Sequence, residues 1–156
     1  MRFASLPRVA ILAILSLGLA ITACNSAAPP DTFPGQPVTE RNKTFKQMIR
    51  AFEPIGLMAR GKEPFAADKA ITSATELKRL STLPWNHFPA GSDYAPTKAK
   101  AAIWEKPTEF KRAQDQFVAA ADKLASAAQA RELDTLQPAY DAVHQSGSSC
   151  HKAFRR

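Results

Sequence analysis

Apolar residues recur every three or four positions along most of this chain, which is the spacing of one face of a helix. The first such pattern spans about Thr39 to Arg60. We expect Thr39 to cap this helix, Pro54 to kink its last turns and Gly61 to end it. Its apolar face is formed by Phe45, Met48, Ile49, Phe52 and Ile55.

Three further helical patterns follow, at about Ala66 to Thr82, from Pro107 onward, and at about Glu132 to Arg155. Proline is favoured in the first turn of a helix, so Pro107 is a natural start. In the last pattern the steps alternate between three and four residues, which predicts one buried face. That face is formed by Leu133, Leu136, Tyr140, Val143, Gly147, Cys150 and Phe154.

A long segment, Pro84–Lys106, connects the second and third predicted helices. It contains enough large apolar side chains to pack over one end of a bundle. No Asn-Gly or Asp-Gly pair separates alternating apolar runs, so hairpins are not expected. The pattern therefore predicts an all-α fold, an antiparallel four-helix bundle with a long crossover between helices 2 and 3.

The N-terminal region has the pattern of an export signal rather than of a folded element. Arg2 and Arg8 precede an apolar run that is short for a membrane span. The run ends in Ile-Thr-Ala-Cys, which resembles a bacterial lipobox with Cys24 as the lipid attachment site; an ordinary signal peptide is the alternative. We expect a lipoprotein signal peptide over 1–23, a flexible tether over 24–38, and the bundle over 39–156.

The net charge of +7 is spread along the chain without a long basic run. This distribution favours a solvated surface over nucleic-acid binding. The chain has two cysteines. If Cys24 carries lipid, Cys150 has no disulfide partner in an oxidising compartment, which indicates a chemical role for this thiol.

Cys150 lies three residues after Gly147 and is followed directly by His151. Covalent haem attachment needs a thiol that adds to a vinyl group and an adjacent imidazole that reaches the iron, and this pair supplies both groups. Two other interpretations fit the same residues. Cys150 can be a small buried apolar residue, or His144, Cys150 and His151 can bind zinc or copper in a haem-free bundle.

Four segments in order resemble the cytochrome c-prime family, the haem four-helix bundles of bacterial periplasms. They are ERNKTFKQMIRAF, ARGKEPFAAD, the crossover LKRLSTLPWNHFPAGSD with TKAKAAIW, and VHQSGSSCHKAFR. The last resembles the family's C-x-x-C-H run with its first cysteine replaced by Gly147. The resemblance covers about Arg41 to Arg155 and implies one haem c, attached here through Cys150 alone.

The resemblance also implies roles for individual residues. His151 matches the proximal iron ligand, and Arg155 the arginine beside that imidazole. Arg41 matches an arginine near the haem propionates. Phe45 occupies the distal position and cannot bind iron, which implies a five-coordinate iron. Met48, one turn later, is the nearby rival ligand, although an ordinary core methionine is favoured.

The function that the resemblance implies is electron transfer, binding of a small gas such as nitric oxide, or both. The sequence contains no evident acid–base or nucleophile set, so no enzyme activity is expected. The expected location is the periplasm, with a lipid anchor and a preference for the outer membrane because Asn25 follows Cys24. Expected partners are acidic periplasmic or membrane redox proteins, with a homodimer possible in this family.

Overall fold

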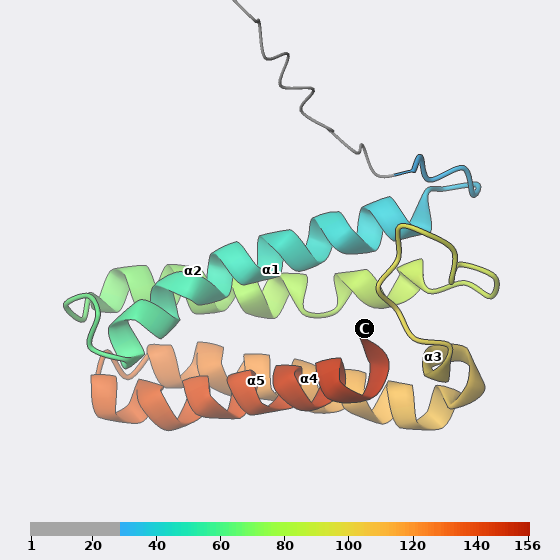
Figure 1. The fold of residues 1–156 in the computed structure, drawn as a ribbon. Coiled ribbons are helices and arrows are strands. Elements are labelled where there is room, and N and C mark those ends of the chain that lie inside the picture. The colour runs from blue at the N-terminus through green and yellow to red at the C-terminus, as the bar shows by residue number, and fades with distance from the viewer. Residues whose placement is uncertain (1–28) are drawn as a thin grey trace, which may run out of the picture.

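The computed structural model describes residues 29–156, which form a bundle of antiparallel helices (Figure 1). The described residues contain no strand, only one isolated antiparallel bridge between Ala99 and Arg155. The all-α prediction is confirmed. The elements are α1 (Pro37–Ala59), α2 (Ala67–Leu80), a 3₁₀ turn η1 (Leu83–His87), α3 (Ala102–Glu105), α4 (Pro107–Ala128) and α5 (Leu133–Phe154).

Helix α1 starts two residues earlier than expected. Its N-cap is Gln36, and Pro37 takes the first helical position. The prediction that Thr39 caps the helix is wrong, since its backbone N–H already lies in the first turn, where Asp31 Oδ2 accepts its hydrogen bond at 2.7 Å. Asp31 also accepts a hydrogen bond from the Tyr94 hydroxyl. The last part of the expected tether therefore packs against the crossover.

Gly61 ends α1 as predicted. It adopts a positive φ of 64°, and its N–H donates to Met58 O at 3.0 Å. The N–H of Lys62 donates to Leu57 O at 2.8 Å. This pair of bonds is a Schellman motif, which favours glycine because a Cβ is strained in the left-handed region.

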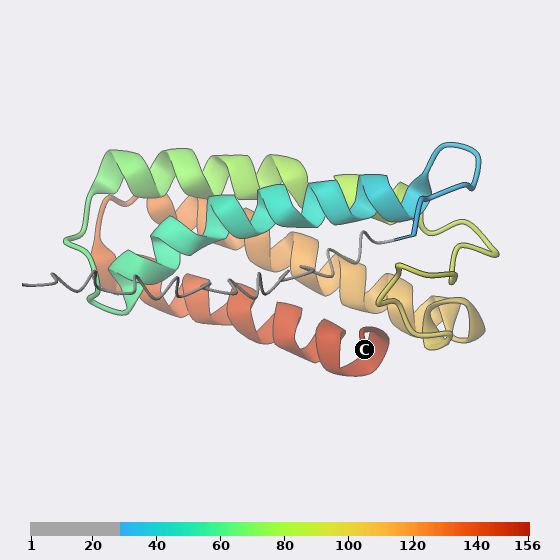
Figure 2. The same cartoon turned by 45° about the horizontal axis from the view of Figure 1, so that its top comes forward.

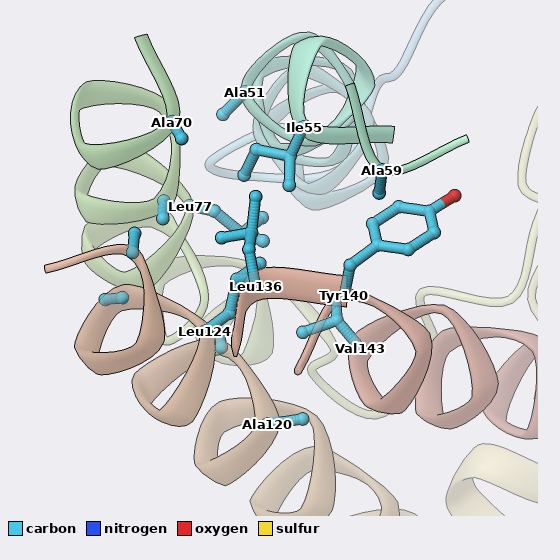
Figure 3. Close-up of a cluster of buried hydrophobic side chains, with 14 of the residues drawn as sticks. Ala51, Ile55, Ala59, Ala70, Leu77, Ala120, Leu124, Leu136, Tyr140 and Val143 are labelled. Carbon is cyan, nitrogen blue, oxygen red and sulfur yellow. The ribbon is translucent and has the colours of Figure 1, made fainter. Parts of the chain in front are cut away.

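The four long helices bury one main apolar cluster between them (Figure 3). Ile55 of α1, Leu124 of α4 and Leu136 of α5 are completely buried within it. Ile49 was expected on this face, but its side chain is 62 % exposed. It follows Met48 directly, and successive residues on a helix are rotated by about 100°, so Met48 points inward and Ile49 outward.

Helices α1 and α5 meet closely at the end where α1 finishes and diverge toward the end where α5 finishes (Figures 1 and 2). Where they meet, Tyr140 packs against Gly56, and Arg60 donates a hydrogen bond to the Tyr140 hydroxyl. A Cβ at Gly56 would lie 3.1 Å from two atoms of Tyr140. Glycine at this position therefore sets the distance between the two helices.

The crossover closes the other end of the bundle, as its apolar content predicted. A second, smaller apolar cluster lies there, and Trp85, Phe88 and Trp104 pack against it. The chain end is pinned to the crossover, because Lys100 N donates to Phe154 O at 2.9 Å and Arg156 N to Lys98 O at 2.8 Å. The buried members of the second cluster are Ala99, Ile103, Phe110 and Phe154.

None of the helices among residues 29–156 is long and apolar enough to cross a membrane.

Candidate functional site

Cys150 and His151 lie in the last turns of α5, beside the second apolar cluster. Cys150 is half-buried and packs against that cluster, while His151 is exposed. Consecutive residues on a helix point about 100° apart, so the thiol and the imidazole leave α5 in different directions. The pair therefore has the arrangement needed to bond the edge of a flat ligand and to reach its centre.

Both side chains have pKa values displaced from their ordinary range. Burial raises the pKa of the Cys150 thiol, which keeps it protonated at neutral pH. Desolvation by the neighbouring turns lowers the pKa of His151, and the charge of Arg155 lowers it further. Metal binding requires the neutral imidazole, so both effects on His151 favour ligation.

Gly147 lies one turn before Cys150 on the side of α5 that faces α4. A Cβ built there would meet only Phe117 Cε2, at 4.0 Å, which is an ordinary contact. A Cβ at residue 147 is therefore accommodated without a close contact.

Aromatic rings from three elements gather beside this part of α5. Phe45 of α1 makes edge contacts with Trp85 and Phe88, with centroids 5.8 and 6.4 Å apart. Trp85 also meets Phe117 at 6.4 Å. Phe45 is half-buried, and its distal role stays a prediction. Met48 is buried in the main core cluster, as an ordinary core methionine would be.

The two crossover tryptophans differ in their hydrogen bonds. Trp104 Nε1 donates to Phe88 O and Pro89 O. Trp85 Nε1 is buried without a hydrogen-bond partner among the described residues. A buried donor without an acceptor is costly and is uncommon in native proteins. A flat apolar ligand that carries acceptor groups, such as haem with its carboxylates, fits this aromatic environment and its free donor.

Arg41 is 2 % exposed and holds the crossover to α1. Its guanidinium donates to His87 O and Ser92 Oγ at 2.9 Å, and to Ser92 O and Thr97 Oγ1 at 2.6 Å. It also lies 4.6 Å over the Phe88 ring. Burial lowers its pKa, but a guanidinium remains charged. The proposed propionate contact of Arg41 stays a prediction.

The alternative metal site is wrong. The described residues contain no group of three His, Cys, Asp or Glu side chains that could hold a metal ion. His144 lies against Tyr140, with ring centroids 6.2 Å apart. It is two turns before His151, about 10 Å along the helix axis, and this separation prevents the two imidazoles from sharing one ion.

Sequence comparison identifies the family. The Cytochrome C′ family model matches residues 36–155. The chain belongs to the cytochrome c′ family. It is 32 % identical over 123 residues to cytochrome c′ of Rubrivivax gelatinosus, covering 78 % of this chain and 95 % of that protein. It is also 34 % identical over 106 residues to cytochrome c-554 of Cereibacter sphaeroides, covering 65 % and 79 %.

Solved cytochrome c′ structures have the same fold. The Rubrivivax gelatinosus structure matches with a TM-score of 0.76 at 31 % identity, covering 81 % of this chain and all of that one. Cytochrome c prime of Shewanella frigidimarina matches at 0.77 and 30 % identity, covering 80 % and 98 %. A variant of the Alcaligenes xylosoxidans protein in complex with nitric oxide matches at 0.74 and 31 % identity, covering 80 % and 97 %.

The sequence interpretation missed two features of the site. The first is the set of crossover acceptors for Arg41, although Arg41, Thr44 and Met48 follow the inward helical spacing and could have indicated a buried arginine. The second is the free N–H of Trp85, which no sequence pattern marks. Cys24 lies outside the described residues.

Proposed function

We propose that this protein binds one haem c, held by a single thioether bond from Cys150 and by His151 as the axial iron ligand. The observation that carries the proposal is the Cys150–His151 pair in the last turns of α5, beside an aromatic cluster with an unpaired buried donor. Membership of the cytochrome c′ family supports it.

A bound haem supplies redox chemistry and a site for a small ligand on its iron. The residues of this chain control access to it. His151 offers a neutral imidazole, and Arg155 keeps the imidazole neutral to lower pH. Phe45 has no group that can bind iron, so we propose a five-coordinate iron with a crowded distal side.

We propose electron transfer, binding of a small gas, or both, and no enzyme activity. Relatives of similar fold support the gas-binding part, since variants of the Alcaligenes xylosoxidans protein have been solved with nitric oxide and with carbon monoxide.

We propose a location in the bacterial cell envelope. A signal peptide over 1–23 would export the chain, and lipid on Cys24 would anchor it, with the outer membrane favoured. Intact-mass spectrometry of the envelope fraction would report lipid and porphyrin together.

The haem proposal is tested by expressing the full chain in a bacterium that makes c-type cytochromes. We expect a Soret band and a haem stain that stays with the protein on a denaturing gel. Cys150→Ser should lose the covalent stain, and Ser149→Ala, an exposed neighbour, should keep it. A colourless wild-type protein, or covalent haem in Cys150→Ser, would contradict the proposal.

A further inference from the structure

The end of the bundle that carries the candidate haem site also carries a cluster of positive charge. The isolated bridge between Ala99 and Arg155 joins two segments that are distant in the sequence. One is 94–104 of the crossover, and the other is 142–156, the last turns of α5 with the two residues after it. We call their five cationic residues the basic end surface. These residues are Lys98, Lys100, Lys152, Arg155 and Arg156.

The backbone fixes how these residues lie. Lys100 N and Arg156 N make the two hydrogen bonds that pin the chain end to the crossover, and Lys100 Nζ donates to Lys152 O at 2.8 Å. Lys100 is half-buried, and the other four side chains are exposed. The cluster is therefore a feature of the folded molecule and not of one flexible tail.

The five cationic side chains of this surface lack an ion-pair partner among the described residues. Neither segment contains an aspartate or a glutamate, although Asp93, Glu105 and Asp141 flank the segments directly. None of the five residues forms an ion pair within 29–156, whereas cations elsewhere do, for example Lys111 with Asp115 at 2.5 Å and Lys78 with Asp122 at 2.5 Å. Holding like charges together costs stability, and a partner of opposite charge offsets that cost.

Two members of the basic end surface lie next to the proposed iron ligand. Lys152 follows His151 directly, and Arg155 N donates to His151 O at 2.9 Å. With haem held as proposed by Cys150 and His151, a protein docked on this surface would lie nearer to the haem than one docked at the opposite end of the bundle, and a shorter distance favours electron transfer.

We infer that the basic end surface is the docking site for an acidic electron-transfer protein. This inference rests on the proposed haem function and adds the position at which an acidic partner docks. Complementary charge raises the rate of encounter and selects the orientation in which the haem faces the partner.

The test uses the haem-loaded full chain and reduced flavodoxin, an acidic flavoprotein, as the probe. Stopped-flow absorbance gives the electron-transfer rate, and isothermal titration calorimetry gives the affinity. Raising the ionic strength from about 0.01 M to about 1 M shortens the screening length from about 30 to about 3 Å. We expect both the rate and the affinity to fall roughly tenfold or more over that range.

Charge reversal then locates the surface. The double variant Lys98→Glu with Lys152→Glu should lower the electron-transfer rate at low salt roughly tenfold. The contacts between the crossover and the chain end should persist, because they use the main-chain oxygens of these two residues and not their side chains. The matched control is Lys62→Glu with Lys123→Glu, two exposed lysines toward the other end of the bundle, with the same change in net charge. The control should change the rate much less.

Three results would overturn the inference. They are rates that do not depend on salt, equal effects of the two double variants on the rate, and binding to phosphatidylglycerol vesicles that is lost in Lys98→Glu with Lys152→Glu while the rate is unchanged, which would assign the surface to a membrane. The absorption spectrum recorded before mixing separates the two proposals. Haem without salt dependence contradicts only the docking site, while a colourless protein removes both.

Discussion

At the scale of single residues, a glycine lies one turn before the proposed attachment cysteine. By the resemblance, Gly147 matches the first thiol of the C-x-x-C-H run, and the nearest atom to a Cβ there is 4.0 Å away. With attachment through Cys150 alone, as proposed, one haem vinyl group should remain unreacted.

Gly147→Cys should restore the second bond. The α-band of the pyridine haemochrome should move to shorter wavelength, because saturating the second vinyl group shortens the conjugation of the macrocycle. Ser148→Cys is the control, since residue 148 is exposed and lies off the face of Gly147. An unchanged spectrum in Gly147→Cys, with the mass showing a free thiol, would show that the pocket does not present a vinyl group there.

The imidazole of His151 should titrate below its ordinary pKa of 6.5 in the haem-free Cys150→Ser protein. Desolvation disfavours the charged form first, and Arg155 adds repulsion, so Arg155→Gln should raise the pKa. The unfolded chain binds this proton more readily. The contribution of His151 to the free energy of unfolding is therefore complete above pH 6.5, and it is lost as the pH falls through the pKa of His151 in the folded protein.

NMR titration of the His151 ring protons measures this pKa directly. Arg156→Gln is the matched control, because Arg156 does not contribute to the shift of His151. An equal rise of the pKa in both variants would show a general charge effect in place of the specific one from Arg155.

At the scale of elements, one buried arginine connects the crossover to α1. Arg41→Met should lower the free energy of unfolding by about 2–4 kcal/mol, because the acceptors on Ser92 and Thr97 lose charged donors. Urea denaturation followed by circular dichroism measures the loss. Arg50→Met, an exposed change on the same helix, should cost about 0.5 kcal/mol or less.

Two helical glycines should respond in opposite ways to alanine. Gly56→Ala places a Cβ 2.7 Å from Arg60 Nη1 and 3.1 Å from Tyr140, which should destabilise the bundle by about 1–3 kcal/mol despite the better helix propensity. Gly147→Ala meets no such neighbour and should stabilise by about 0.5–1 kcal/mol in the haem-free protein. Thermal unfolding of both variants tests the pair.

The helices could be predicted from the sequence because their apolar spacing is regular. Pro107 and Gly61 marked their boundaries through backbone chemistry that acts within one or two residues. The start of α1 was placed two residues too late, although Pro37 is a local start signal of the same kind as Pro107. Contacts between distant segments, such as Arg41 with the crossover, leave no local pattern in the chain.

Part of the candidate site was also predictable. Cys150, His151 and Gly147 were found because their spacing is a local motif, and the structure places them beside one another on α5. The unpaired N–H of Trp85 could be found only in the structure. It results from the packing of Phe45 and Phe117, two distant aromatic residues, against the indole.

At the scale of the whole molecule, the two apolar clusters divide the bundle into parts that depend differently on haem. The main cluster spans all four long helices, and the second one lies beside Cys150. In the haem-free Cys150→Ser protein, hydrogen exchange should remain slow around Leu124 and Leu136. It should become fast in the crossover and in the last turns of α5.

The matched comparison is the haem-loaded wild type, in which both regions should be protected. Uniformly fast exchange without haem would mean that the cofactor holds the entire bundle together. Uniformly slow exchange would mean that the second cluster is complete on its own.

The bond from Arg156 N to Lys98 O fastens the last residues to the crossover, beside the apolar cluster against which Cys150 packs. With haem attached through Cys150 as proposed, we expect attachment to take place before this contact forms.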